Sequence, residues 1–97
     1  MSGERRDAVV SVQQRLLADA IGRFLSSRGL EVRAPYERSV VDLVVTDASV
    51  SPVAGRVVVT LPRQPGGHSS VMVADRAVDL TVNGVEDLDA VIDLLVP

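Results

Sequence analysis

Four side chains with hydrogen-bonding groups stand at the ends of apolar segments, where they could form a binding site. Asp47 directly follows a nearly continuous apolar segment, and Thr60 lies near the end of another. Gln13 and Asn83 follow two further segments. Because the carboxyl ends of parallel strands meet at one edge of a sheet, we expect these four side chains to converge there. One carboxylate, one hydroxyl and two amides could bind a small ligand.

Simpler interpretations compete with this one. Asp47 can be a turn residue that caps the next segment, and a threonine such as Thr60 is common in strands. A catalytic group of His68 with Ser69 or Ser70 is disfavoured, because sequence neighbours rarely adopt the geometry of a triad. We find no nucleophile–base pair, metal cluster or cofactor loop. The sequence therefore predicts no enzyme, no cofactor and no metal.

The composition excludes several classes of protein. The 97 residues are 46% hydrophobic and 24% charged, as in ordinary globular domains, and they include no cysteine and one histidine. All ten basic residues are arginine, so no lysine chemistry is available. The net charge of −3 and the two aromatic residues argue against nucleic-acid binding by this segment. No run is long enough to span a membrane and no signal peptide is present, so we expect a cytoplasmic location.

The first part of the chain predicts a strand, a helix and a second strand. Residues 8–12 are apolar and β-branched, which favours a strand. Residues 14–27 predict a helix, because apolar residues recur at helical spacing: Leu16, Leu17, Ala20, Ile21, Phe24 and Leu25. Gly29 is expected to end the helix in a left-handed conformation. Residues 30–33 alternate and predict a short strand.

The second part predicts buried strands and a final helix. Residues 40–46 and 56–61 are nearly continuous apolar runs, typical of strands at the centre of a parallel sheet. Residues 69–75 could form a strand or a short helix. Residues 78–82 alternate and predict a strand, and apolar spacing over residues 85–95 predicts the last helix.

The spacing of these elements predicts one reduced α/β domain over residues 1–97, with residues 1–6 disordered. Two connections between strands are too short for a crossover helix, so the middle helices should be shortened or missing. The central strands are apolar on both faces, and one face would then lack a helix layer. A second copy, another protein, or the loops 33–39, 48–55 and 62–70 would have to cover it.

Several segments, in their order along the chain, resemble one known family. Residues 8–29 look like a first strand and first helix, and the phrase RLLADA at 15–20 is typical of actinobacterial members. Residues 41–47, 57–60 and 76–83 look like the third, fourth and fifth strands. In this order they resemble the receiver domains of bacterial response regulators, most closely the NarL/LuxR type. The resemblance implies a flavodoxin-like, mostly parallel five-stranded sheet that retains the first and last helices.

The resemblance also implies a phosphorylation site, and this chain departs from it. Asp47 takes the phosphoacceptor position and Thr60 the position of the switch hydroxyl. The acidic pair that holds Mg²⁺ in receivers is replaced by Val12 and Gln13, and Asn83 stands where the family has its lysine. Without these charges, neither Mg²⁺ nor a phosphoryl group would be neutralised at Asp47. The site therefore looks degenerate.

Together these observations predict a non-phosphorylatable, receiver-like regulatory domain. It would act in signalling or transcriptional control through protein–protein interaction, as a homodimer or with another protein on one sheet face. The alternative is a small-ligand-sensing module that binds at the edge where the strands end. The last helix is followed at once by Pro97, where a receiver would enter its linker to a DNA-binding domain; a stand-alone domain and a part of a larger regulator are both compatible with this.

Overall fold

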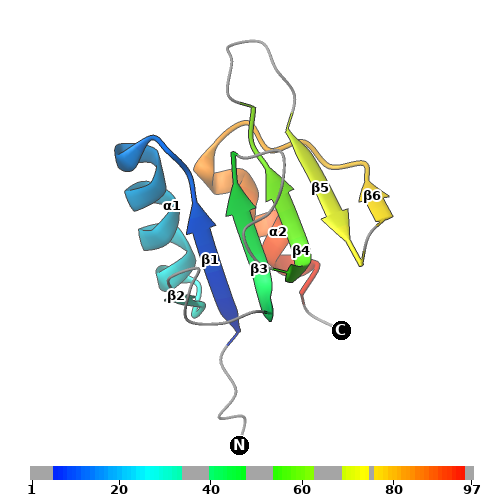
Figure 1. Cartoon of the computed structure of the whole chain (residues 1–97), viewed down its shortest axis with the longest axis horizontal. Helices are drawn as coiled ribbons and strands as arrows, with labels where there is room; N and C mark the ends of the chain where they lie inside the picture. The colour runs from blue at the N-terminus through cyan, green and yellow to red at the C-terminus, as the bar shows by residue number, and fades with distance from the viewer. Residues whose placement is uncertain (1–5, 34–39, 48–53, 63–68, 75, 96–97) are drawn as a thin grey trace, which may run out of the picture.

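Strands and helices alternate only in the first part of the chain. The computed structural model describes residues 6–33, 40–47, 54–62, 69–74 and 76–95, and every structural statement below concerns these residues. The predicted disorder of residues 1–6 therefore falls almost entirely outside them, as does His68. The elements, labelled in Figure 1, are in order β1 (Asp7–Ser11), α1 (Arg15–Ser27), β2 (Glu31–Arg33), β3 (Val40–Thr46), β4 (Ala54–Thr60), β5 (Ser70–Val73), β6 (Arg76–Val78), the 3₁₀ turn η1 (Val85–Asp87) and α2 (Leu88–Asp93).

Helix α1 agrees with the helix predicted over residues 14–27. Ile21 and Leu25 are buried, and Leu17 and Phe24 pack partly buried against the same core. Leu16 was expected on this face, but it is 81% exposed. It lies on the neighbouring side of the helix, one residue before the buried stripe, which therefore follows the spacing 17, 21, 24 and 25.

The end of α1 also follows the prediction. Gly29 has a φ of 88°, the left-handed conformation that glycine adopts without steric cost. The backbone N–H of Leu30 donates to the carbonyl of Leu25 at 3.1 Å, which satisfies one of the last helical carbonyls. The chain can therefore reverse at once into β2.

The sheet has six strands and is mixed. The strand order is β2-β1-β3-β4-β5-β6; the first four strands in this order are parallel, whereas β4–β5 and β5–β6 are antiparallel pairs. The predicted mostly parallel sheet of five strands is thus correct for β1 to β4 and wrong beyond them. A hairpin connects β5 to β6, with Ala74 in its turn at a φ of 51°.

This hairpin changes the interpretation of residues 69–82. The ambiguous stretch 69–75 contains the strand β5 (Asp75 itself lies outside the described residues). The fifth strand implied over residues 76–83 is correct only for its first three residues, and the strand expected over 78–82 only for its first, because β6 ends at Val78 and residues 79–84 belong to no strand. The antiparallel hairpin occupies the edge of β4, so no edge of β4 remains for residues 78–82.

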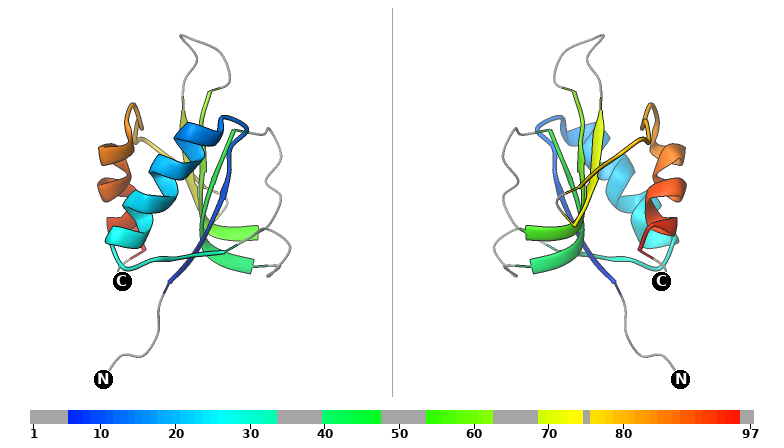
Figure 2. Two further views of the ribbon diagram at one scale, coloured as in Figure 1. Left: turned by 90° about the vertical axis from the view of Figure 1, so that its left-hand side faces the viewer. Right: turned by 90° about the vertical axis from the view of Figure 1, so that its right-hand side faces the viewer.

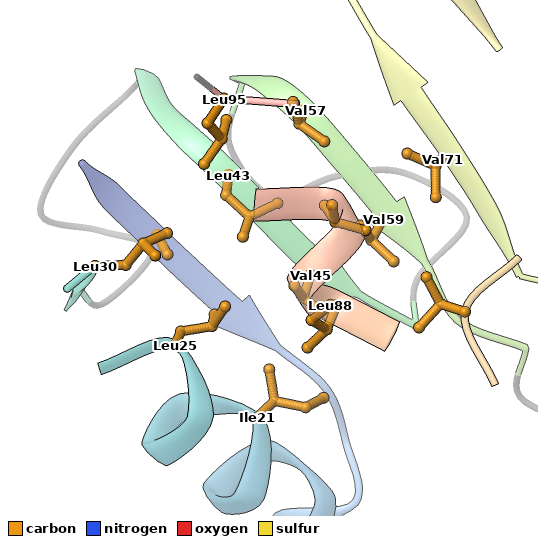
Figure 3. Close-up of a cluster of buried hydrophobic side chains, with 13 residues drawn as sticks. Ile21, Leu25, Leu30, Leu43, Val45, Val57, Val59, Val71, Leu88 and Leu95 are labelled. Atoms are coloured by element: carbon orange, nitrogen blue, oxygen red, sulfur yellow. The ribbon is translucent and has the colours of Figure 1, made fainter. Parts of the chain in front are cut away.

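Both helices lie on one face of the sheet, which we call the helix face (Figure 2). The main core forms between them and the sheet, and Figure 3 shows its aliphatic side chains. Its fully buried members include Leu43, Val57, Val59, Leu88 and Leu95. None of the helices in the described residues is long and apolar enough to cross a membrane.

An ion pair joins the end of α1 to the first turn of α2. Both Nε and Nη2 of Arg28 lie 2.8 Å from the carboxylate oxygens of Asp89. The Arg28 guanidinium also lies 5.0 Å from the ring centre of Phe24. Because Arg28 and Asp89 are about half exposed, this pair positions α2 more than it stabilises the fold.

The opposite side of the sheet, which we call the second face, has no helix among the described residues, yet its centre is buried. Val9 and Val44 are 0% exposed and pack with Val41, which is 4% exposed. Figure 2 shows the beginnings of β3 and β4 turning sharply away from the helices, to the side of this face. Val41, near the start of β3, packs in the buried cluster with Val9 and Val44, and Gly55, near the start of β4, lies close to Val44. Part of the covering thus comes from the starts of two strands. Of the loops that were expected to cover this face, residues 34–39, 48–53 and 63–68 lie outside the described residues.

Gly55 makes this bend possible. A Cβ atom at Gly55 would lie 2.8 Å from Cγ2 of Val44 and 3.2 Å from the carbonyl oxygen of Val57. Val44 is fully buried and β-branched, so it cannot move aside easily. Only glycine lets the bent start of β4 approach Val44 this closely.

We therefore expect Gly55→Ala to lower the free energy of unfolding by about 1–3 kcal/mol, measured by urea denaturation, because the added methyl group overpacks the second face. Gly22→Ala is the matched control. Gly22 is in the middle of α1, where an added Cβ meets nothing within 4 Å, so this variant should gain about 0.5–1 kcal/mol. Equal effects of the two substitutions would show that the close approach at Val44 is unimportant.

Candidate functional site

Asp47 ties together the loops at the edge where the parallel strands end. Its carboxylate Oδ2 accepts a hydrogen bond from the backbone N–H of Gln13 at 3.1 Å. Its own backbone N–H donates to the carbonyl of Ser11 at 3.3 Å. Asp47 therefore continues the pairing of β1 with β3 for one residue and holds the loop that leads into α1. The role weighed for it in the sequence, capping of the next segment, concerns residues 48–53, which lie outside the described residues.

A cavity of about 360 Å³ opens beside this carboxylate, and we call it the edge cavity. It is lined by Val12, Gln13, Gln14, Leu17, Asp47, Leu61 and Pro62. Asp47 is the single charged residue among them. No group of three or more potential metal ligands exists among the described residues. The described residues of the edge cavity therefore present one carboxylate, and not the acidic cluster that holds Mg²⁺ in oxygen-ligand sites.

A second cavity, of about 260 Å³, lies on the helix face, and we call it the helix pocket. It is lined by Leu17, Ile21, Val45, Leu61, Pro62, Ser69, Thr81, Val82, Asn83, Gly84, Val85 and Leu88. These residues come from α1, from the ends of β3 and β4, from the position before β5, and from the segment that leads into α2 together with the first residue of α2. None of these described lining residues has a charged side chain. Because Leu17, Leu61 and Pro62 also line the edge cavity, the two cavities adjoin.

The wall of the helix pocket is held by hydrogen bonds outside any strand. The Asp87 carboxylate accepts the backbone N–H groups of Asn83 at 2.7 Å and Gly84 at 3.2 Å. The hydroxyl of Ser69 accepts the backbone N–H of Val82 at 2.9 Å. The sequence predicted Asp87 only as part of the last helix over residues 85–95, and its role as an acceptor for the turn before that helix was missed. The spacing of an acidic residue three positions after Gly84 is the signal for it, because a side chain there can reach back to the turn.

The structure brings together only some of the four predicted site residues. Gln13 and Asp47 line the edge cavity, and Asn83 lines the helix pocket beside it. Thr60 lines neither. Val57 and Val59 pack in the core on the helix face, so alternation along β4 directs Thr60 to the second face. Thr60 therefore does not lie with the other three predicted site residues.

Thr60 belongs instead to a row of hydroxyl residues that the sequence did not reveal. Ser11 pairs with Thr46, Thr46 with Thr60, and Thr60 with Ser70, across four neighbouring strands of the sheet. Thr46 is fully buried, and no buried side-chain polar atom of the described residues lacks a hydrogen-bond partner. The row depends on strand register, which no single segment encodes.

Comparison with protein-family models, with curated proteins and with solved structures finds no match to this chain.

The turn at Asp87 yields a direct test of the pocket wall. Asp87→Ala should lower the free energy of unfolding in urea by about 1 kcal/mol, because two backbone N–H groups lose their shared acceptor. Asp87→Asn keeps a side-chain oxygen as acceptor, so it should lose less than half as much. If the alanine variant were as stable as the native chain, Asp87 would not organise this wall.

Proposed function

We propose that this chain is a regulatory domain of receiver-like, flavodoxin-like architecture that works by binding and not by phosphoryl transfer. The strand order β2-β1-β3-β4-β5 supports the architecture, because doubly wound sheets of the flavodoxin type have this order. The first and last helices also share one face, as the resemblance to receivers implies. The reversed direction of β5 and the added β6 are departures particular to this chain. We include a cytoplasmic location in the proposal.

The observation that carries the proposal is the hydrogen bond from Gln13 to Asp47. At the position where receivers hold Mg²⁺ with carboxylates, this chain offers the amide side chain and the backbone N–H of Gln13, and that N–H already binds the Asp47 carboxylate. The lysine that would contact a phosphoryl group has no counterpart, since the chain contains none. Phosphoryl transfer needs such charges to neutralise the transferred group.

The second face supports the view that the domain binds a protein. Val9, Val44, Val58, Met72 and Ala77 pair in one row across five strands. The first two are fully buried, Val58 is half-buried, and Met72 is 38% exposed. The apolar row is thus covered at β1 and β3 and open at β5 and β6. We propose that a second copy of the chain covers this open half in a homodimer.

The absence of phosphoryl chemistry can be tested with beryllofluoride, which imitates a phosphoryl group on an aspartate. With Mg²⁺ present, we expect beryllofluoride to leave the thermal unfolding midpoint of the chain unchanged, because one carboxylate cannot hold the ion. The same titration on Asp47→Ala is the control, and the ligand-induced shifts are compared, since this variant also loses the Gln13 hydrogen bond. A rise in the native midpoint that is absent in Asp47→Ala would contradict the proposal.

Self-association can be tested by sedimentation velocity from micromolar to near-millimolar chain concentration. We expect concentration-dependent dimerisation, weakened at least about tenfold by Met72→Arg, because two like charges would meet across a symmetric interface. Ala90→Arg adds the same charge at an exposed position of α2, on the other side of the sheet, and should dimerise normally. A native chain that stays monomeric over this range would refute the homodimer.

The adjoining cavities favour a second candidate function, the sensing of a small ligand at the edge where the strands end. Ligands of α/β proteins bind in crevices at this edge, and an apolar pocket with a few polar groups is the usual form of such a site. The helix pocket has this composition. Regulation by a ligand and by a partner are compatible, because the pocket and the open apolar row lie on opposite faces of the sheet.

A further inference from the structure

We propose that the helix pocket binds a small neutral molecule with a branched aliphatic body and one hydrogen-bonding group, such as a short-chain carboxamide. This inference rests on the ligand-sensing candidate function and specifies its place and its ligand class. It excludes phosphate, carboxylates and metal ions as occupants.

The pocket exists because residues 79–84 leave the sheet. The β5–β6 hairpin pairs with the edge of β4, and after Val78 the chain passes to the helix face on its way to α2 (Figures 1 and 2). Val82 is buried there in the main core. Since this segment is held by Ser69 and Asp87 and not by a neighbouring strand, it stands as a separate wall facing α1.

The floor of the pocket is aliphatic. Ile21, Val45 and Leu88 line the pocket and are each no more than 2% exposed, and Figure 3 shows their side chains within the aliphatic core between the helices and the sheet. None of them offers a hydrogen bond to water. A water molecule in a protein interior needs two to four polar partners, so an aliphatic group fits this floor better than water does. Burying apolar ligand surface there is favourable.

The polar groups of the pocket are neutral and lie toward its opening. Ser69 accepts the N–H of Val82, and its hydroxyl keeps a proton that can be donated to a ligand. Thr81 and Asn83 are exposed and contribute a hydroxyl and an amide. A ligand with both a carbonyl and an N–H group can bond to such a set, because it contains donors and acceptors.

Charge discriminates against anions at this site. None of the lining residues that the structure describes carries a positive charge, and the carboxylates of Asp47 and Asp87 lie nearby, one lining the adjoining cavity and the other bonded to the backbone N–H of Gly84. A buried anion would lose its hydration without gaining a cation. The volume of about 260 Å³ corresponds to roughly nine water molecules at about 30 Å³ each, which fits a molecule of this kind.

Isovaleramide is a suitable probe, and isovalerate is its anionic counterpart of nearly the same shape. In ¹H–¹⁵N NMR titrations of the full chain, isovaleramide should cause saturable shifts at the amides of residues 81–85 and of Leu17 and Ile21. Isovalerate should bind at least about tenfold more weakly, because its charge is unpaired in the pocket.

Two variants block the pocket at different depths. Val85→Phe places a ring in the half-buried lining, and Thr81→Trp covers the opening from an exposed position, where it cannot disturb the core. Both should lose isovaleramide binding, and Thr81→Trp keeps the test valid if Val85→Phe fails to fold. Ile92→Phe is the control: Ile92 is half-buried against the same core but does not line the pocket, so binding should persist.

The possible results distinguish a wrong ligand class from a wrong function. Equal binding of isovalerate at residues 81–85 would overturn the neutral class and leave ligand sensing intact. Saturable shifts confined to Gln13 and Asp47 would overturn the choice of the helix pocket. If neither probe shifts any of these amides in the folded native chain, both the inference and the ligand-sensing function fail.

Discussion

Two helices on one side of a six-stranded sheet leave a second face to be buried, and this constraint shapes the rest of the molecule. Strands β3 and β4 are apolar on both faces, so exposing the second face would be costly. The chain bends the beginnings of these two strands over it, and the bend requires the close contact of Gly55 with Val44. Val9 is buried by the same cluster. Two strands thus act partly as their own covering layer.

The bend covers the side of β1 and β3 and leaves β5 and β6 open. Their pairing is antiparallel, and β6 has only three residues. A short, twisted edge strand limits unwanted pairing with other chains, since it offers few backbone groups. The side chains of this half can still bind a partner, because Met72 extends the apolar row beyond the covered region. Partner binding through side chains, and not through the strand edge, is therefore the form of association that this sheet favours.

Much of the fold could be predicted from sequence, because its central elements have strong local patterns. The strand Val40–Thr46 agrees with its prediction residue for residue, and α1 differs by one. The main errors in assigning strands fall after β4. Alternation in Val78–Val82 predicts an extended chain but does not say whether another strand lies beside it. The direction of Ser70–Val73 is equally invisible, because parallel and antiparallel strands can have the same pattern; tertiary pairing decides between them.

A single segment does not show how it is placed against its neighbours, and this limit also explains which residues of the candidate site could be predicted. Gln13 and Asp47 could be placed together because each follows a parallel strand, and the structure has them hydrogen-bonded. Thr60 was misplaced, because its direction depends on alternation relative to buried neighbours and not on its nearness to a strand end.

The acidic residues of these loops have a common structural use, which bears on what the site can do. Asp47 and Asp87 both accept backbone N–H groups, one holding the entry to α1 and the other the wall before α2. A carboxylate that binds backbone donors organises a loop whether or not any ion is present. These acids are used in this way, and the described residues that line the helix pocket between the two loops are all neutral. This edge of the sheet is therefore suited to holding an uncharged molecule, which such residues recognise by shape and by hydrogen bonds.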